Sequence, residues 1–195
     1  MTRLAILGAV AAFAGGAAAG AAPWEPPDDV ATRPPVDAGT TSIDLRPSGN
    51  LHKELGEPAG LTTATGEGVY FEITVRDIAV RTSCPGRGVQ APPRHGYFVV
   101  VDLQASMSDK VEEVVGGADV FMPLTADAFA VVAADGTRTT ATLTDASWSC
   151  FEDDALAAPF VGPGETTSGS VVLDSPVASG TLVYAPGGVG WEWDF

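Results

Sequence analysis

The chain has 195 residues, which is enough for one domain with a sizeable core and for additional segments. It carries 10 basic and 25 acidic residues, and a formal charge of −15 argues against nucleic acids and anionic lipid surfaces as partners. This negative charge is compatible with cations or basic surfaces as partners. The alternative is that the acidic surface only keeps the protein soluble.

The N-terminus has the pattern of a secretory signal peptide. Arg3 precedes an apolar run over residues 4–14, and Ala19-Gly20-Ala21 gives the small-residue pattern that signal peptidase requires. We expect cleavage after Ala21, so that residues 1–21 are the signal peptide and no membrane insertion follows. The alternative is an uncleaved anchor, because residues 4–22 approach membrane-spanning length.

Residues 22–57 are rich in Pro, Asp, Thr and Gly and show no sustained apolar period. Such a segment cannot bury enough apolar surface to offset the entropy lost on ordering. We therefore expect a disordered linker over residues 22–57 and a folded domain over residues 58–195.

The folded domain begins with "GVYFEITVRDIAV", residues 68–80. Val69, Phe71, Ile73 and Val75 alternate towards one face, and the apolar set then moves to Ile78. A change of face within one strand needs an extra residue, which predicts a β-bulge near Arg76-Asp77.

The next strand, "GYFVVVDLQASMSD", is apolar on both faces at its start and on one face at its end. Its continuous series, which includes Val99, Val101 and Leu103, predicts the face that packs in the core. Phe98 and Val100 lie on the other face. Either a loop or the linker covers them, or they form an exposed binding patch.

Asp135-Gly136 predicts a hairpin between residues 129–133 and 137–143, because Gly accepts the positive φ of a tight turn. A loop with one helical turn near residues 153–157 follows, and three further strands complete the chain. Seven to nine short strands with almost no helix predict an all-β fold, an antiparallel β-sandwich.

Cys84 and Cys150 are the two cysteines of the chain. Export implies an oxidising compartment, where two cysteines most simply form one structural disulfide. No C-x-x-C pair or adjacent histidine indicates a metal or redox role.

The strand pattern resembles the secreted immunoglobulin-like β-sandwich family of high-GC Gram-positive bacteria, which includes a mycobacterial immunoprotective extracellular antigen and related extracytoplasmic domains of unknown function. Three features carry the resemblance: Phe98–Gln104, Asp135-Gly136, and Pro163-Gly164-Glu165 with Gly169–Pro176. Ser108 and Asp109 replace the family's Asn after the long strand. The resemblance implies an immunoglobulin-like fold and export, and it implies no defined activity.

No catalytic motif is present in the sequence. His52 lies in the linker and His95 in a Pro-rich loop, and there is no G-x-S-x-G motif to supply a nucleophile. P-loop, dinucleotide-binding and EF-hand patterns are also absent. We expect a non-enzymatic protein without a cofactor.

Acidic clusters are weak candidates for a Ca²⁺ site, because hard cations prefer several carboxylate oxygens. Neither cluster has the ordered ligand spacing of a Ca²⁺ loop, and the acidic composition alone explains such runs. One connector holds Asp109, Glu112, Glu113 and Asp119, and another holds Glu152, Asp153 and Asp154.

Trp191, Trp193 and Phe195 share one face of the last strand. We expect this face to close the core, with Glu192 and Asp194 solvated on the other face. The alternative is an exposed aromatic platform for sugars or a partner protein.

These features predict a secreted or extracytoplasmic domain, associated with the cell surface, that binds a protein or a cell-envelope component. The alternative is a purely structural accessory domain of an envelope assembly. The sequence gives no indication of the oligomeric state.

Overall fold

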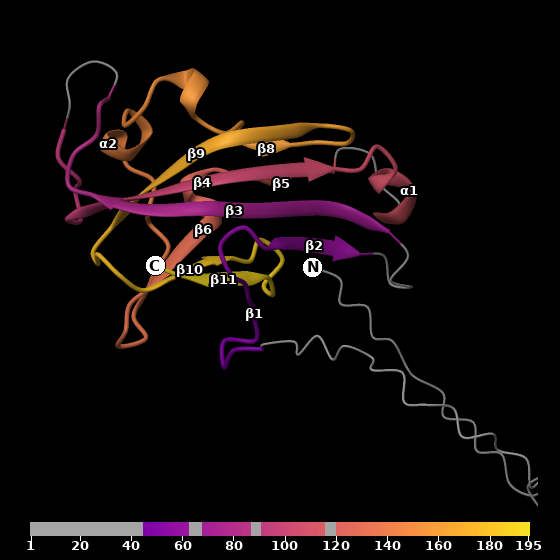
Figure 1. Cartoon of the computed structure of the whole chain (residues 1–195), viewed down its shortest axis with the longest axis horizontal. Coiled ribbons are helices and arrows are strands. Elements are labelled where there is room, and N and C mark those ends of the chain that lie inside the picture. Colours follow the sequence, from indigo (N-terminus) through magenta and orange to yellow (C-terminus); the bar gives the residue numbers. More distant parts are fainter. Residues whose placement is uncertain (1–44, 63–67, 87–90, 116–119) are drawn as a thin grey trace, which may run out of the picture. The chain divides into compact units, whose positions relative to one another are not determined.

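The computed structural model describes residues 45–62, 68–86, 91–115 and 120–195, which all belong to one compact unit (Figure 1). The predicted signal peptide and most of the predicted linker lie outside the described residues. Within the described ranges, no helix is long and apolar enough to cross a membrane.

Two β-sheets form a sandwich, which confirms the predicted fold class. Figure 1 shows the long strands of one sheet running side by side. In order, this sheet contains β2 (Pro58–Thr62), β3 (Val69–Arg81), β4 (Tyr97–Met107) and β9 (Thr166–Ser175). The other contains β1 (Leu51–His52), β11 (Trp191–Asp194), β10 (Thr181–Tyr184), β6 (Phe129–Val132) and β7 (Arg138–Thr139).

Short elements connect the sheets. They are α1 (Val111–Val115), η1 (Ala126–Ala128), α2 (Asp145–Trp148), η2 (Asp153–Ala155), and the pair β5 (Met122–Pro123) and β8 (Phe160–Val161). The described residues contain more strands than the seven to nine predicted. The additional ones are short, since β1, β5, β7 and β8 have only two residues each. The β1–β11 pair is parallel, whereas the other strand pairs are antiparallel.

The predicted bulge in β3 is confirmed. The register between β3 and β4 shifts between Val75 and Asp77, so that the apolar face changes at this point. Phe71, Ile73 and Val75 are buried as predicted, but Val69, at the start of the strand, is 48% exposed.

Strand β4 is buried on both faces at its start because each face has its own cover. Val99, Val101 and Leu103 pack in the main core with residues of the other sheet. Phe98 and Val100 point to the opposite face, where they pack with the Cys84–Cys150 disulfide in a second apolar cluster. The apolar pattern therefore follows from two cores on the two sides of one sheet.

The Asp-Gly hairpin is also confirmed. Gly136 has a φ of +84°, and the Ala133 N–H donates to the Thr137 carbonyl across the turn. The returning strand β7 is shorter than predicted, since it ends at Thr139.

Residues 45–57, which the sequence analysis assigns to the linker, are folded onto the five-stranded sheet. Leu51 pairs with Trp191, and His52 pairs with Glu192. Asn50 is buried between these segments, where its side-chain amide donates to Glu192 and its side-chain oxygen accepts from the Gly190 N–H. The folded unit therefore begins before residue 58.

Candidate functional site

The predicted patch on Phe98 and Val100 is not exposed. Phe98 is fully buried and Val100 is 6% exposed, because the disulfide between Cys84 and Cys150 lies over them. The disulfide itself is confirmed. Since a docking surface must be accessible, these two side chains have a structural role and form no binding patch.

Trp191 and Trp193 are buried in the main core, as the core interpretation of the last strand predicts, and the exposed aromatic platform is wrong. The expected solvation of the opposite face is wrong for Glu192, which is 6% exposed. Ser48 covers this carboxylate and donates a 2.7 Å hydrogen bond to it, whereas Asp194 is exposed. The N-terminal segment that covers Glu192 carries no apolar pattern, which is why its sequence predicts a linker.

The described residues of the first acidic connector form no metal site. Asp109, Glu112 and Glu113 are exposed around α1, and Asp119 lies outside the described residues. Among the residues with described positions, no group of three or more His, Cys, Asp or Glu side chains is arranged to hold a metal ion.

His95 contacts the fully buried carboxylate of Asp174, but this contact is structural. The backbone N–H groups of Arg94 and His95 donate to the two Asp174 oxygens at 2.6 and 2.8 Å. The Thr144 hydroxyl donates to the same carboxylate at 2.8 Å. These bonds occupy the carboxylate that a catalytic His–Asp pair would need, and they join two loops to β9.

His52, the second histidine, lies on the five-stranded sheet and not in a linker. Its Nε2 atom is 3.3 Å from the Asp194 carboxylate. This contact connects β1 to β11. His52 is not among the residues that line the cleft described next.

A cleft of about 470 Å³ lies along the edge of β9, and we call it the β9 cleft. Its volume is within the range of small-ligand sites. Its floor contains Ser170, Val171 and Val172 of β9, and residues 124–126 and Thr167 also line it. Residues from segments 143–148 and 153–159 line it as well, and we call these segments its first and second walls. Leu143 and Trp148 are 43% and 52% exposed, so the cleft offers apolar surface to solvent.

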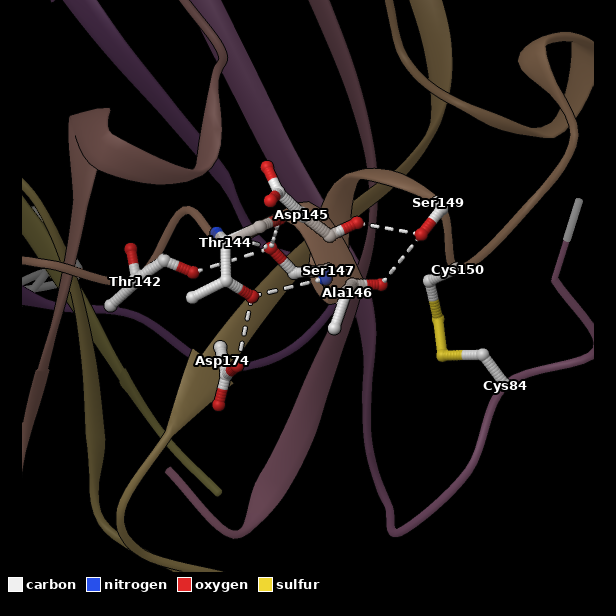
Figure 2. The surroundings of a disulfide bond; sticks show 9 residues. All are labelled: Cys84, Thr142, Thr144, Asp145, Ala146, Ser147, Ser149, Cys150 and Asp174. Carbon is white, nitrogen blue, oxygen red and sulfur yellow. Dashed lines mark hydrogen bonds between the residues drawn. A yellow bond between two sulfur atoms is a disulfide. The ribbon is translucent and has the colours of Figure 1, made fainter. Parts of the chain in front are cut away.

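The first wall depends on the N-terminus of α2. Thr144 and Ser147 form a capping box, in which the Thr144 hydroxyl accepts from the Ser147 N–H and the Ser147 hydroxyl accepts from the Thr144 N–H. Figure 2 shows this cap between Asp174 on one side and the disulfide at Cys150 on the other. A helix of four residues is marginal alone, so these two anchors fix the position of Trp148.

The second wall approaches β9 closely. The Ala157 N–H donates to the Ser170 carbonyl at 3.0 Å, and a Cβ atom at Gly169 would lie 2.6 Å from the Ala157 nitrogen. Only a glycine permits this approach, because any side chain would meet the backbone of the wall. The wall carries the acidic rim of the cleft, Asp153 and Asp154.

No pattern in the sequence predicts the β9 cleft as a site, although Asp153 and Asp154 belong to a predicted acidic cluster with a predicted helical turn beside it. That turn is confirmed as η2. The Thr144-x-x-Ser147 spacing and Trp148 two residues before Cys150 were the available signals, but α2 is too short to show an apolar period.

Comparisons with known proteins give little further information. No family model matches the chain, and no curated protein matches it. The chain is similar to the crystal structure of a secreted protein from Mycobacterium tuberculosis, MPT63, at 14% identity and a TM-score of 0.46. The similarity covers 75% of this chain and 98% of the other, and it carries no functional assignment.

Proposed function

We propose that this chain is an exported, non-catalytic domain that binds a cationic ligand bearing an apolar group in the β9 cleft. The observation that carries the proposal is the combination of exposed apolar side chains, Leu143 and Trp148, with an acidic rim at Asp153 and Asp154. The Cys84–Cys150 disulfide supports export, since such bonds persist in oxidising compartments. The strand pattern resembles that of the secreted immunoglobulin-like family described above, which also supports export.

Charge complementarity gives the sign of the ligand. Asp153 and Asp154 are the charged residues among those that line the cleft, and Asp145 and Glu152 are exposed beside them. The Arg81 guanidinium lies on the neighbouring surface, 5.9 Å from the centre of the Phe151 ring. Exposed carboxylates around an apolar wall attract cations and repel anions, and a Trp face adds a favourable cation–π contact.

The composition of the cleft supports binding and not catalysis. The lining residues include no His and no Cys, and its two carboxylates are neighbours in sequence on one wall. General acid–base catalysis or nucleophilic attack requires an activated group facing a second group across the substrate. A cleft of this composition recognises shape and charge.

The test is a titration of the purified domain with an acetylated, amidated hexapeptide of alternating Val and Lys, compared with the same peptide of Val and Glu. We expect the cationic peptide alone to bind, with an affinity that falls as salt is added. Trp148→Ala and Asp154→Asn weaken binding, each by about tenfold or less. Phe121→Ala is the matched control, because Phe121 is 56% exposed but does not line the cleft.

Equal binding of the two peptides, no binding of either, or equal loss in Trp148→Ala and Phe121→Ala would overturn the proposal. No binding of either peptide would favour the alternative in which the domain is a structural accessory of an envelope assembly.

A further inference from the structure

We infer that the ligand of the β9 cleft is an extended polypeptide segment, which the domain recognises through the backbone N–H and C=O of Val172. The inference rests on the proposed function, because it specifies the chemical class that enters the same cleft. It depends on how the edge of β9 is paired along its length.

In an antiparallel ladder the N–H and C=O of one residue point to the same side, and the side alternates from residue to residue. Met107 of β4 exchanges hydrogen bonds towards the β9 side, with the Glu165 carbonyl and the Gly164 N–H. Even-numbered residues of β4 therefore point their backbone groups towards β3. Val100 is one of them, and it stands opposite Val172.

The backbone groups of Val172 must then point away from β4, towards the outer edge of the sheet. Two hydrogen bonds, one on each side of Val172 along β9, confirm this alternation. The Ser170 carbonyl accepts from the Ala157 N–H, and the Asp174 N–H donates to the Thr142 carbonyl at 2.7 Å. The outward backbone groups of Ser170 and Asp174 named here are thus paired with other parts of the chain.

Val172 lies between these two covers, in the floor of the cleft. No described residue outside β9 forms a hydrogen bond with its backbone N–H or C=O. The edge of β9 is therefore paired at Ser170 and Asp174 and unpaired at Val172 between them. Val172 is 5% exposed in total, because its side chain packs in the second apolar cluster, so only its backbone groups can meet a ligand in the cleft. An unpaired strand edge is a template for a second strand.

A peptide residue opposite Val172 can supply one N–H and one C=O, which are the two groups that this position needs. Its neighbours cannot continue along β9, because Ala157 and Thr142 occupy the edge. The peptide therefore forms a single bridge and leaves the edge on both sides, where its apolar side chains meet Leu143 and Trp148 and its cationic side chains meet Asp154. Alternating side-chain directions in an extended segment suit this division.

Charge excludes the chain itself as the occupant. Residues 22–44 contain five acidic residues and one basic residue, so this segment is repelled by the acidic rim. A second copy of the domain meets the same repulsion, because the whole chain has a formal charge of −15. The occupant is a basic segment of another protein.

The first experiment changes the protein. Val172→Pro removes the outward N–H, and at this position Pro removes no bond of the β4–β9 ladder. Val172→Ala, the matched control, keeps the N–H and loses buried side-chain volume in the same place. We expect the Val–Lys hexapeptide to bind about tenfold more weakly to Val172→Pro and within about threefold of the original affinity to Val172→Ala.

The second experiment changes the ligand and does not depend on how Val172→Pro folds. One hexapeptide is N-methylated at its three Val residues and another at its three Lys residues. Because alternate N–H groups of an extended peptide point to opposite edges, we expect one methylated peptide to lose binding and the other to retain it. Unchanged binding of both would overturn main-chain recognition.

A third probe separates this inference from the proposed function. The compound n-octylammonium has the charge and the apolar group but no amide. If it displaces the hexapeptide, and the hexapeptide itself binds to Val172→Pro as tightly as to the unmodified domain, the cleft binds cationic apolar ligands but does not recognise a polypeptide backbone. If neither probe binds to the unmodified domain, the proposed function fails.

Discussion

The hydroxyl of Thr144 donates a 2.8 Å hydrogen bond to the fully buried carboxylate of Asp174. This bond joins the residue before α2 to strand β9, and it places one wall of the β9 cleft against the sheet that forms its floor. The same carboxylate holds the loop before β4 through the N–H groups of Arg94 and His95. One wall of the cleft is therefore held in place by a buried carboxylate whose two oxygens both accept hydrogen bonds.

Thr144→Val removes this donor and the N-cap of α2 together. We expect the free energy of unfolding to fall by about 2 kcal/mol, because a helix cap and a hydrogen bond to a charged group are lost at once. Urea denaturation followed by circular dichroism measures the change. Thr140→Val is the control, since Thr140 is exposed, and it should stay within about 0.5 kcal/mol. Equal effects of the two variants would show that the Thr144–Asp174 bond contributes nothing.

The disulfide closes a loop with a sequence separation of 66 residues. In the chain-entropy model, its removal by a double Cys84→Ser/Cys150→Ser change costs about 4 kcal/mol. The loss should also expose Phe98 and Val100, which pack beneath it. Comparison of unfolding curves and of dye binding to apolar surface, with and without the disulfide, measures both effects. Unchanged dye binding in the folded variant would show that the loop covers these side chains without the bond.

Truncation tests the start of the folded unit. Removal of residues 1–44 should leave the stability unchanged, whereas removal of residues 1–57 should destabilise the domain by about 2 kcal/mol or more. The second truncation deletes Asn50 and leaves the buried Glu192 carboxylate without the two side chains that donate to it, Ser48 and Asn50. Thermal unfolding of the two truncated chains and the full chain gives the comparison. Equal stability of both truncated chains would restore the boundary predicted at residue 58.

Burial raises the pKa of Tyr184, whose hydroxyl donates to the Pro123 carbonyl at 3.0 Å. A group with a raised pKa in the folded state favours its neutral form there. Its contribution to stability is fully present below the pKa of the unfolded chain, about 10, and it is lost as the pH rises above that value. We expect the loss of stability between pH 9 and pH 11 to be smaller in Tyr184→Phe. An equal loss in both proteins would contradict a neutral, buried Tyr184.

Local patterns were sufficient to predict much of the sandwich. The period of two in β4, the change of face at the Val75–Asp77 bulge and the Asp135-Gly136 turn are each set by residues that are neighbours in sequence. The disulfide was predictable because the expected export favours oxidation and two cysteines leave one pairing. These features need no knowledge of distant contacts.

The N-terminal boundary and the cleft could not be predicted, because both depend on distant pairs. Asn50 and Glu192 are 142 residues apart in sequence, and the residues around each of them do not indicate that the other packs against it. The open position at Val172 exists because Ala157 and Thr142 meet β9 on either side of it. A strand pattern shows which face is apolar, but it does not show which edge stays unpaired.

Amide hydrogen exchange at Val172 tests the account most directly. In the free domain, the N–H groups of Val171 and Leu173 point to β4 and should exchange slowly, whereas that of Val172 should exchange much faster. Saturation with the Val–Lys hexapeptide should slow exchange at Val172 and leave its two neighbours unchanged. A Val172 amide as protected as its neighbours in the free domain, or equally fast with and without the peptide, would contradict the account.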